Sequence, residues 1–166
     1  MSYFILIRGP LGSGKTTISK KLAESLNAEE IRMDDVLDKH GLDKIDEKEE
    51  CIPARNFIEA NQIILPSVEK HLENEKIVIF DACFYHQEAI DDLIESLDFP
   101  HFAFTLKLPL EICIERDSKR DKVYGEGAAW AVHNLVSKFD YGNLIDVSQN
   151  LDETIEEILS YLPKTD

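Results

Sequence analysis

Short apolar runs alternate along this chain with longer stretches in which apolar residues recur every three or four positions. The short runs are typical of strands, and the longer stretches are typical of amphipathic helices. Strands are expected at residues 3–7, 29–33, 76–80, 102–108 and 144–147. Helices are expected at about 15–26, 53–74, 87–97, 110–120, 128–139 and 151–162. Because strands and helices alternate, the pattern predicts an α/β fold with three layers, a parallel sheet covered by helices on both faces.

Three local features modify this pattern. Pro66 lies inside the expected helix at 53–74 and should kink or divide it, because proline lacks a backbone N–H and clashes with the preceding turn. Residues 38–51 are strongly charged and are expected to form a mobile, exposed connection. Trp130 and Phe139, on the expected helix at 128–139, are interpreted as core residues rather than as a platform for a base.

The length and the composition predict one domain over residues 1–166. The chain has 166 residues, and 43% of them are hydrophobic, which allows one sizeable core. No apolar run approaches the roughly 20 residues of a membrane helix, and the first strand begins at once, so no signal peptide is expected. The cysteines Cys51, Cys83 and Cys113 are widely spaced. A disulfide or zinc site is therefore not expected, and a reducing cytoplasm is the predicted location.

The formal net charge of −15 limits the kinds of partner. A protein that binds polynucleotides through their phosphates needs a positive surface, so DNA and RNA are not the expected partners. The few arginines fall near the expected functional positions: Arg8, Arg32, Arg55, Arg116 and Arg120. Because guanidinium groups bind phosphate well, these arginines indicate a small anionic ligand inside an otherwise acidic shell.

Residues 9–16 fit the pattern G-x-x-x-x-G-K-[ST] of a phosphate-binding loop, and they lie between an expected strand and an expected helix. The glycines allow a tight turn that brings several backbone N–H groups toward one anion. The Lys15 ammonium is predicted to reach the β- and γ-phosphates of ATP, and the Thr16 hydroxyl to bind Mg²⁺. The predicted nucleotide-binding residues are Gly9, Pro10, Leu11, Gly12, Ser13, Gly14, Lys15, Thr16 and Thr17. An ordinary glycine-rich turn is the weaker alternative.

Carboxylates follow two of the expected strands. Asp81 comes after the run at 76–80, where an acid in proteins with this loop holds the Mg²⁺ shell together with the loop threonine. Asp34 and Asp35 follow the strand at 29–33 and should emerge at the same edge of the sheet. Asp34 is predicted to accept the proton of a substrate hydroxyl, with Asp35 as the next candidate. The alternatives are structural: Asp81 would cap a turn, and Asp34 and Asp35 would be the N-cap pair of a short helix.

Arg116 and Arg120 lie four residues apart on an expected helix, and a segment with two glycines, Gly125 and Gly127, follows them. A cationic lid at about 116–128 would exclude water from ATP and stabilise charge on the transferring phosphoryl group. The alternative is a solvated helix surface with ion pairs such as Glu115–Lys119.

Taken together, these residues resemble the small P-loop kinases, AAA-type ATP-binding proteins that include nucleoside monophosphate kinases, gluconate and shikimate kinases, chloramphenicol phosphotransferase and the kinase domain of polynucleotide kinase. The motifs that carry the resemblance are the N-terminal loop, the Asp34–Asp35 pair, Asp81 and the Cys-x-x-Arg-x-x-x-Arg helix at 113–120. The resemblance implies a five-stranded parallel sheet in the order 2-3-1-4-5. It also implies that Asp34, Asp35 and Arg55 bind the phosphate acceptor.

Three functions follow from this reading. The preferred one is ATP- and Mg²⁺-dependent transfer of the γ-phosphate to a hydroxyl, or a phosphate, of a small-molecule acceptor by a monomer or homodimer. The second is a polynucleotide 5′-hydroxyl kinase, although the arginine that follows the acidic pair in such enzymes is absent here. The third, from a different class, is a nucleotide-dependent ATPase switch or interaction module, which needs no acceptor pocket.

Overall fold

A five-stranded parallel sheet forms the centre of the molecule. The computed structural model describes residues 1–164. The strands are β1 (Phe4–Arg8), β2 (Glu29–Arg32), β3 (Val78–Ala82), β4 (His101–Lys107) and β5 (Asn143–Asp146). Their order across the sheet is β2-β3-β1-β4-β5, and every pair is parallel. The expected α/β fold and the strand order implied by the resemblance are both confirmed.

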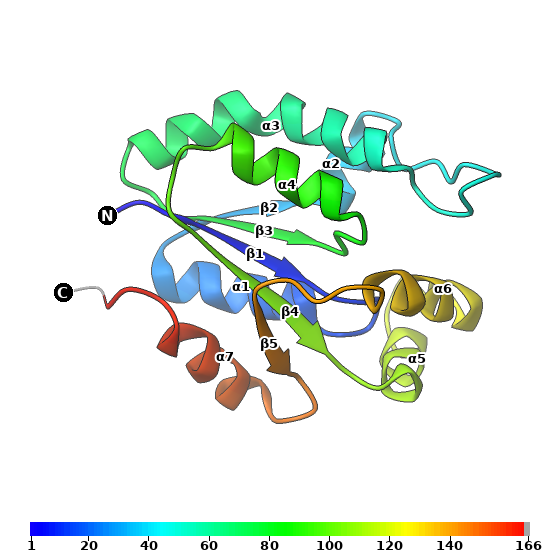
Figure 1. Cartoon of the computed structure of the whole chain (residues 1–166). Helices are drawn as coiled ribbons and strands as arrows, with labels where there is room; N and C mark the ends of the chain where they lie inside the picture. The colour runs from blue at the N-terminus through cyan, green and yellow to red at the C-terminus, as the bar shows by residue number, and fades with distance from the viewer. Residues whose placement is uncertain (165–166) are drawn as a thin grey trace.

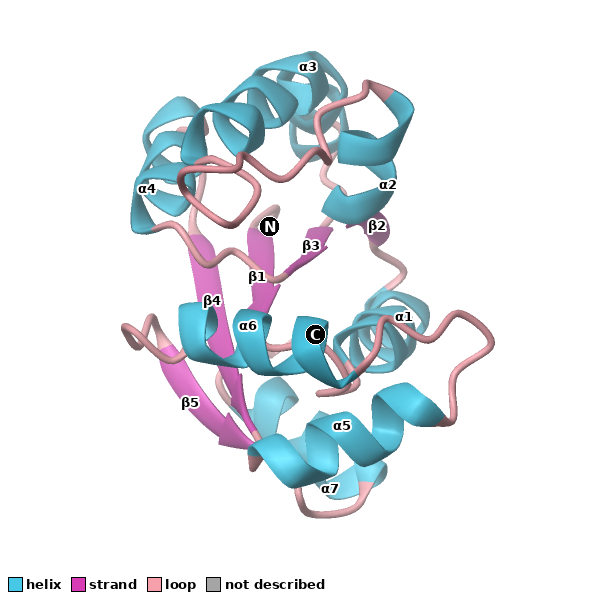
Figure 2. Cartoon of the chain, turned by 90° about the vertical axis from the view of Figure 1, so that its right-hand side faces the viewer, coloured by secondary structure: helices cyan, strands magenta, loops and turns pink. Residues whose placement is uncertain are grey.

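Helices cover both faces of this sheet. They are α1 (Lys15–Leu26), α2 (Met33–Lys39), α3 (Ala54–Glu73), α4 (Gln87–Ser96), α5 (Leu110–Ser118), α6 (Glu126–Val136) and α7 (Leu151–Ser160). In Figure 1, α3 and α4 lie on one face, and α1 and α7 lie on the other. The strand arrows point toward the end of the sheet where α5 and α6 lie side by side, as Figure 2 also shows. The carboxyl ends of the strands, where α/β proteins bind ligands, are thus flanked by these two helices.

The sheet contributes to two apolar cores. Successive side chains of a strand point to opposite faces, so Phe4, Leu6 and Phe80 pack in the core beneath α3 and α4. Ile5 and Ile7 pack in the other core with residues of α1 and α7. Since both faces are buried, β1 is apolar at successive positions rather than at alternate ones.

The strand register brings the candidate site residues to one edge. Ile7 in β1 pairs with Asp81 in β3, and Arg32 in β2 also pairs with Asp81. The phosphate-loop segment begins directly after β1, and α2 begins directly after β2. Residues that are about 50 or more positions apart in the sequence therefore meet at the carboxyl ends of β1, β2 and β3.

Two local expectations need correction, the first only as regards division of the helix. Pro66 does not divide the expected helix, because α3 continues from Ala54 to Glu73. Pro66 and Gln62, whose carbonyl would receive the missing hydrogen bond, are both exposed, so water can satisfy that carbonyl. Trp130 is not a core residue: it is 57% exposed, while Ala129 and Val136 are the buried residues of α6.

Candidate active site

A tight loop, residues 9–14, joins the carboxyl end of β1 to the start of α1. Gly12 and Gly14 have φ angles of 77° and 87°, in the left-handed region that glycine adopts without strain. A Cβ atom at Gly12 would lie 2.3 Å from the carbonyl oxygen of Cys113, so α5 packs directly on the loop backbone. Both the backbone conformation and the close packing therefore require glycine at position 12.

The loop leads into a helix N-terminus without a side-chain cap. Gly14 is the N-cap residue of α1 and forms no side-chain hydrogen bond to the first N–H groups, and the first turn contains no acidic residue. Unpaired N–H groups and the helix dipole at such an end attract anions. This is the local geometry that binding of a phosphate group requires.

Lys15 is the first residue of α1 and is only 8% exposed. Its Nζ donates a hydrogen bond to the Pro10 carbonyl at 3.3 Å. Burial alone would lower the pKa of Lys15, but Cys83, Asp81 and Asp34 together hold this pKa above its ordinary value. Because burial raises the pKa of the Cys83 thiol to about 11, the two carboxylates carry this effect at neutral pH. Lys15 therefore presents a protonated ammonium beside the loop.

Thr16 and Asp81 contact each other at the base of the loop. The Thr16 hydroxyl donates a hydrogen bond to Asp81 Oδ2 at 2.8 Å. Burial raises the pKa of Asp81 above its ordinary value, although Lys15 and Thr16 oppose this shift. A hydroxyl and a carboxylate next to a phosphate loop are the donor set that a Mg²⁺–nucleotide complex uses. Within residues 1–164 no three or more histidine, cysteine, aspartate or glutamate side chains are placed so that they could hold a metal ion by themselves, so a Mg²⁺ ion here needs phosphate and water as further ligands.

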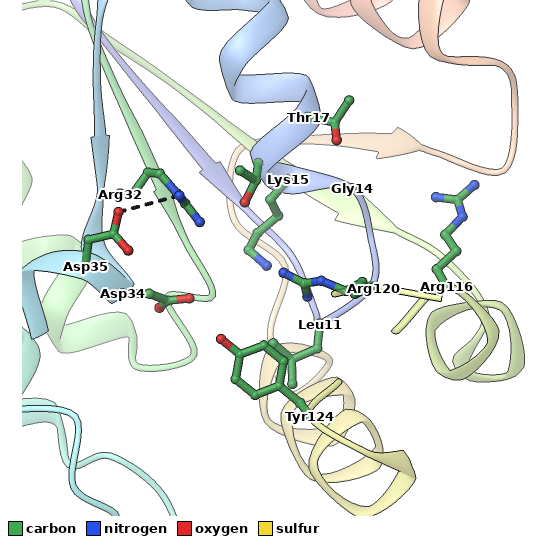
Figure 3. A pocket seen from close by; sticks show the side chains of 12 residues that line it. Leu11, Gly14, Lys15, Thr17, Arg32, Asp34, Asp35, Arg116, Arg120 and Tyr124 are labelled. Carbon is green, nitrogen blue, oxygen red and sulfur yellow. Dashed lines mark ion pairs between the residues drawn. The ribbon is translucent and has the colours of Figure 1, made fainter. Parts of the chain in front are cut away.

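A cavity of about 270 Å³ opens in front of the loop. Its lining comprises Leu11, Gly12, Gly14, Lys15, Thr16, Thr17, Arg32, Asp34, Asp35, Arg116, Arg120 and Tyr124. In Figure 3, the Lys15 ammonium and the Arg120 guanidinium extend into the same space, and Asp34 lies across from them. A protein of net charge −15 thus gathers four cationic side chains around one cavity. Such a concentration of positive charge favours a polyphosphate.

The two predicted lid arginines reach this cavity from α5 and from the turn after it. Arg116 NH2 donates a hydrogen bond to the Val147 carbonyl at 3.3 Å, and the Arg120 guanidinium lies 5.4 Å from the centre of the Tyr124 ring. The Glu115–Lys119 ion pair, expected from the alternative reading, is present as well. This ion pair involves neither Arg116 nor Arg120. The same part of the chain therefore has a solvated face with the ion pair and two arginines that line the cavity.

Asp117 is a site residue that the sequence analysis missed. It is 1% exposed, and its Oδ2 accepts hydrogen bonds from the backbone N–H groups of Tyr124 and Gly125 at 3.1 and 2.8 Å. Its Oδ1 lies 3.9 Å from Arg120 NH1. Asp117 therefore fixes the segment that carries both Arg120 and Tyr124. Its burial could have been inferred, because it lies four residues after the buried Cys113 on the same helix face.

Asp34 and Asp35 lie in the first turn of α2, where negative side chains stabilise a helix. The N-cap position itself is Arg32, so the alternative reading, in which Asp34 and Asp35 are the N-cap pair, is wrong by two and three residues. Asp35 forms an ion pair with Arg32 at 3.5 Å, shown by the dashed line in Figure 3. Among residues 1–164 Asp34 has no such ion-pair partner. Of the two carboxylates, Asp34 is thus the one left available to a substrate hydroxyl.

A second cavity, of about 340 Å³, adjoins the first. The two cavities share four lining residues: Leu11, Asp34, Asp35 and Tyr124. The rest of the second cavity is formed by α2, the segment 43–52, the start of α3, the loop after β3, Lys122 and α6. Asp34 is therefore within reach of a molecule in either cavity.

Arg8 and Arg55 lie outside both cavities. Arg8 is 1% exposed and donates to Thr105 Oγ1 and to the carbonyls of Phe84, Val136 and Phe139. The expectation that it serves an anionic ligand is wrong, because its donors hold β1, β4 and the end of α6 together. Arg55 is exposed and forms ion pairs with Asp46 and Glu49 at 2.9 and 3.0 Å. The structure does not bring Arg55 together with the other predicted site residues.

The chain also matches a known protein family. Residues 4–135 match a protein family described as AAA domain. The chain belongs to this family. The matched region contains the loop, Asp34, Asp81 and the two predicted lid arginines. No curated protein matches the chain.

Several solved structures with the same fold are kinases by name. A sugar kinase from a Janibacter species has a TM-score of 0.79 at 17% identity, covering 97% of this chain and 94% of its own. A gluconokinase from Sinorhizobium meliloti has a TM-score of 0.66 at 17% identity, covering 94% and 89%. An APS kinase from Mycobacterium tuberculosis, in complex with AMPPNP and APS, has a TM-score of 0.67 at 14% identity, covering 96% of both chains. At these identities the likeness establishes the fold, which is that of the small P-loop kinases.

None of the helices within residues 1–164 is long and apolar enough to cross a membrane.

Proposed function

We propose that this protein is an ATP- and Mg²⁺-dependent kinase that transfers the γ-phosphate to a hydroxyl of a small molecule. The observation that carries the proposal is the juxtaposition of two cavities at Asp34. One cavity gathers Lys15, Arg116 and Arg120 at an uncapped helix N-terminus, and the other has room for a second molecule. A kinase needs this arrangement, because donor and acceptor must meet at a carboxylate.

In the proposed reaction the polyphosphate lies along residues 9–17, with its terminal phosphate near Lys15. Asp34 orients the acceptor hydroxyl and receives its proton as the oxygen attacks the γ-phosphorus. A bond forms between the acceptor oxygen and phosphorus, the bond to the β,γ-bridging oxygen breaks, and ADP leaves with that electron pair. Lys15, Arg116 and Arg120 stabilise the negative charge that is spread over the transferring group.

Thr16 and Asp81 are the residues that would hold Mg²⁺, which supplies charge neutralisation on the β- and γ-phosphates. Tyr124 and Arg120 lie on the segment that Asp117 fixes, so this segment is the part of the lid that covers the cavity. The three cysteines are free and buried, which supports the expected cytoplasmic location.

The two alternative functions receive less support. A polynucleotide kinase needs a basic groove beside Asp34, whereas five carboxylates and one lysine line the second cavity. A nucleotide-dependent switch needs no acceptor pocket, and it leaves the position of Asp34 between two cavities without a role.

ATP consumption measured with and without added hydroxyl compounds separates the three functions. The proposed kinase consumes ATP faster when a small acceptor is added, and Asp34→Asn removes that increase. A switch hydrolyses ATP at a rate that no small molecule changes, and this result would refute the proposal. A rate that rises only with oligonucleotide 5′-hydroxyl ends and falls steeply with salt would establish the polynucleotide kinase instead.

A further inference from the structure

The second cavity also indicates which kind of acceptor the protein uses. Building on the proposed kinase function, we infer that the acceptor is a hydroxyl compound with an apolar body and a protonated amine. Acceptors that carry a carboxylate or a phosphate are disfavoured. The inference depends on the charge of the cavity, on its apolar surface, and on the arginines that do not reach it.

The ionisable side chains around the second cavity are nearly all acidic. Its lining contains the carboxylates of Asp34, Asp35, Asp38, Asp43 and Glu50, and the single ammonium of Lys122. The Lys122 Nζ lies 5.2 Å from the centre of the Tyr124 ring, at the side where the two cavities meet. An anionic acceptor would thus meet a negative field over most of the cavity, while a cationic acceptor would be attracted.

The arginines that could offset the negative charge of the second cavity do not line it, and they form ion pairs with carboxylates. Arg55 is paired with Asp46 and Glu49, and it does not line the cavity. Arg32 lines only the first cavity, where it pairs with Asp35. Capture of a carboxylate or phosphate normally uses a guanidinium in bidentate geometry, and the second cavity has none along its described lining.

The interior of the cavity is apolar and partly aromatic. Phe57 and Tyr85 line it and pack edge to face, with ring centres 5.3 Å apart. Aliphatic side chains complete the wall: Leu11, Leu37, Ile45, Ile52, Ala128, Ala131, Val132 and Leu135. Such a wall favours a ring or an alkyl body over a polyhydroxylated sugar, which would lose hydrogen bonds to water. The volume of about 340 Å³ lies at the lower end of the range for small-molecule sites.

Together these surfaces define an orientation for the acceptor. Asp34 lies where the cavities meet, so the hydroxyl belongs there, facing the terminal phosphate. The apolar body lies against Phe57 and Tyr85. The ammonium then lies toward Asp38, Asp43 and Glu50, the carboxylates that line only the second cavity.

Three probes with the same phenyl ring and three-carbon chain test the inference: phenylalaninol, phenylpropanol and phenyllactate. Each carries a hydroxyl, and their net charges at neutral pH are positive, zero and negative. Dissociation constants are measured by calorimetry, with and without ATP, in buffer of low ionic strength. Phenylalaninol should bind about tenfold or more tightly than phenyllactate, with phenylpropanol between them.

A paired variant tests whether the carboxylates cause this preference. The double variant Asp38→Asn and Asp43→Asn should bind both probes with more similar affinity. The ratio of the phenyllactate dissociation constant to the phenylalaninol dissociation constant should fall at least threefold. Glu153→Gln combined with Glu156→Gln makes the same change of net charge on α7, which contributes nothing to either cavity, and should leave the ratio unchanged. If this ratio fell equally in both double variants, only the overall charge of the protein would matter. That result would overturn the assignment of the preference to the carboxylates of the second cavity.

The outcomes separate this inference from the proposed function. If phenyllactate binds as well as phenylalaninol, or if phenylalaninol fails to bind at millimolar concentration to protein that binds ATP, the acceptor class is wrong. If phenylalaninol binds with the stated preference but neither it nor any other hydroxyl compound is phosphorylated, the charge assignment of the cavity stands and the kinase function fails.

Discussion

The Thr16 hydroxyl donates a hydrogen bond to the Asp81 carboxylate at 2.8 Å, although 65 residues separate them in the sequence. The pair forms because α1 starts next to β1 and because β1 and β3 are neighbours in the sheet. Both side chains belong to the predicted metal site. Their contact places a hydroxyl and a carboxylate at the same corner of the phosphate loop.

Asp81→Asn should weaken the apparent affinity for Mg²⁺ in the transfer reaction by about tenfold or more, because the carboxylate is lost while the Thr16 contact can persist. Titration of activity with Mg²⁺ at fixed ATP measures this effect. Asp98→Asn, an exposed change elsewhere on the chain, is the control. Equal Mg²⁺ dependence in the two variants would move the metal site away from Asp81.

The same variant has a consequence for stability. Burial raises the pKa of Asp81, so the folded state holds its proton more tightly than the unfolded state does. Stability from this group is therefore lost as pH rises from the ordinary aspartate pKa, near 4, through the raised value. The free energy of unfolding, measured with denaturant across this pH range, should decline less for Asp81→Asn than for the wild type. A steeper decline in the variant would contradict the raised pKa.

Asp34→Asn should keep ATP binding but lower transfer by about 10²-fold or more, the usual cost of losing a general base. Asp35→Asn, whose carboxylate is paired with Arg32, should have the smaller effect. The comparison uses initial rates at saturating ATP, with ATP affinity measured separately. A larger loss for Asp35→Asn would assign the base to Asp35.

Gly12→Ala should destabilise the protein by about 2 kcal/mol or more and abolish nucleotide binding, because the new Cβ meets the Cys113 carbonyl at 2.3 Å and the φ angle is 77°. Gly127→Ala is the matched change, since no atom lies within 4 Å of its Cβ position. Because Gly127 lies in α6, alanine should stabilise the protein by about 0.5–1 kcal/mol. Thermal denaturation measures the change in stability for both variants. Similar changes in Gly12→Ala and Gly127→Ala would show that position 12 is not constrained as described.

Asp117→Ala should release the segment 118–125, because the N–H groups of Tyr124 and Gly125 lose their acceptor. Transfer should fall by about tenfold or more as Arg120 loses its fixed position. Hydrogen exchange at Tyr124 and Gly125 should accelerate, an effect that a purely electrostatic role would not produce. Exposed Asp121 supplies the control variant Asp121→Ala. Unchanged exchange in Asp117→Ala would contradict the positioning role.

The sequence predicted the elements and the loop well because both depend on local patterns. Apolar periodicity reports burial directly, and the spacing of Gly9, Gly14, Lys15 and Thr16 is a strict requirement of loop geometry. The position of Asp81 followed from the same logic, since it lies in the last part of a buried strand.

The residues that the sequence analysis misjudged depend on long-range contacts. Arg8 looked like a ligand because it precedes the loop, but its partners are 76 to 131 residues away. Arg55 opens the expected helix, yet its two acidic partners come from a segment that has little periodic pattern. No sequence pattern pointed to Tyr124, because its place at the cavity depends on the hydrogen bond from its backbone N–H to Asp117 and on its packing against Arg120. Such placements are set by tertiary structure, which local spacing does not encode.

Calorimetric titration of Mg²⁺–ATP into the wild type, Lys15→Ala and Lys20→Ala tests the central claim most directly. Lys15 is buried beside the loop, while Lys20 is exposed on the same helix, so the two substitutions remove the same charge at different places. The account predicts that the wild type and Lys20→Ala bind ATP alike and that Lys15→Ala binds at least tenfold more weakly. A wild type that does not bind ATP, or a Lys15→Ala variant that binds it as tightly as Lys20→Ala does, would contradict the account.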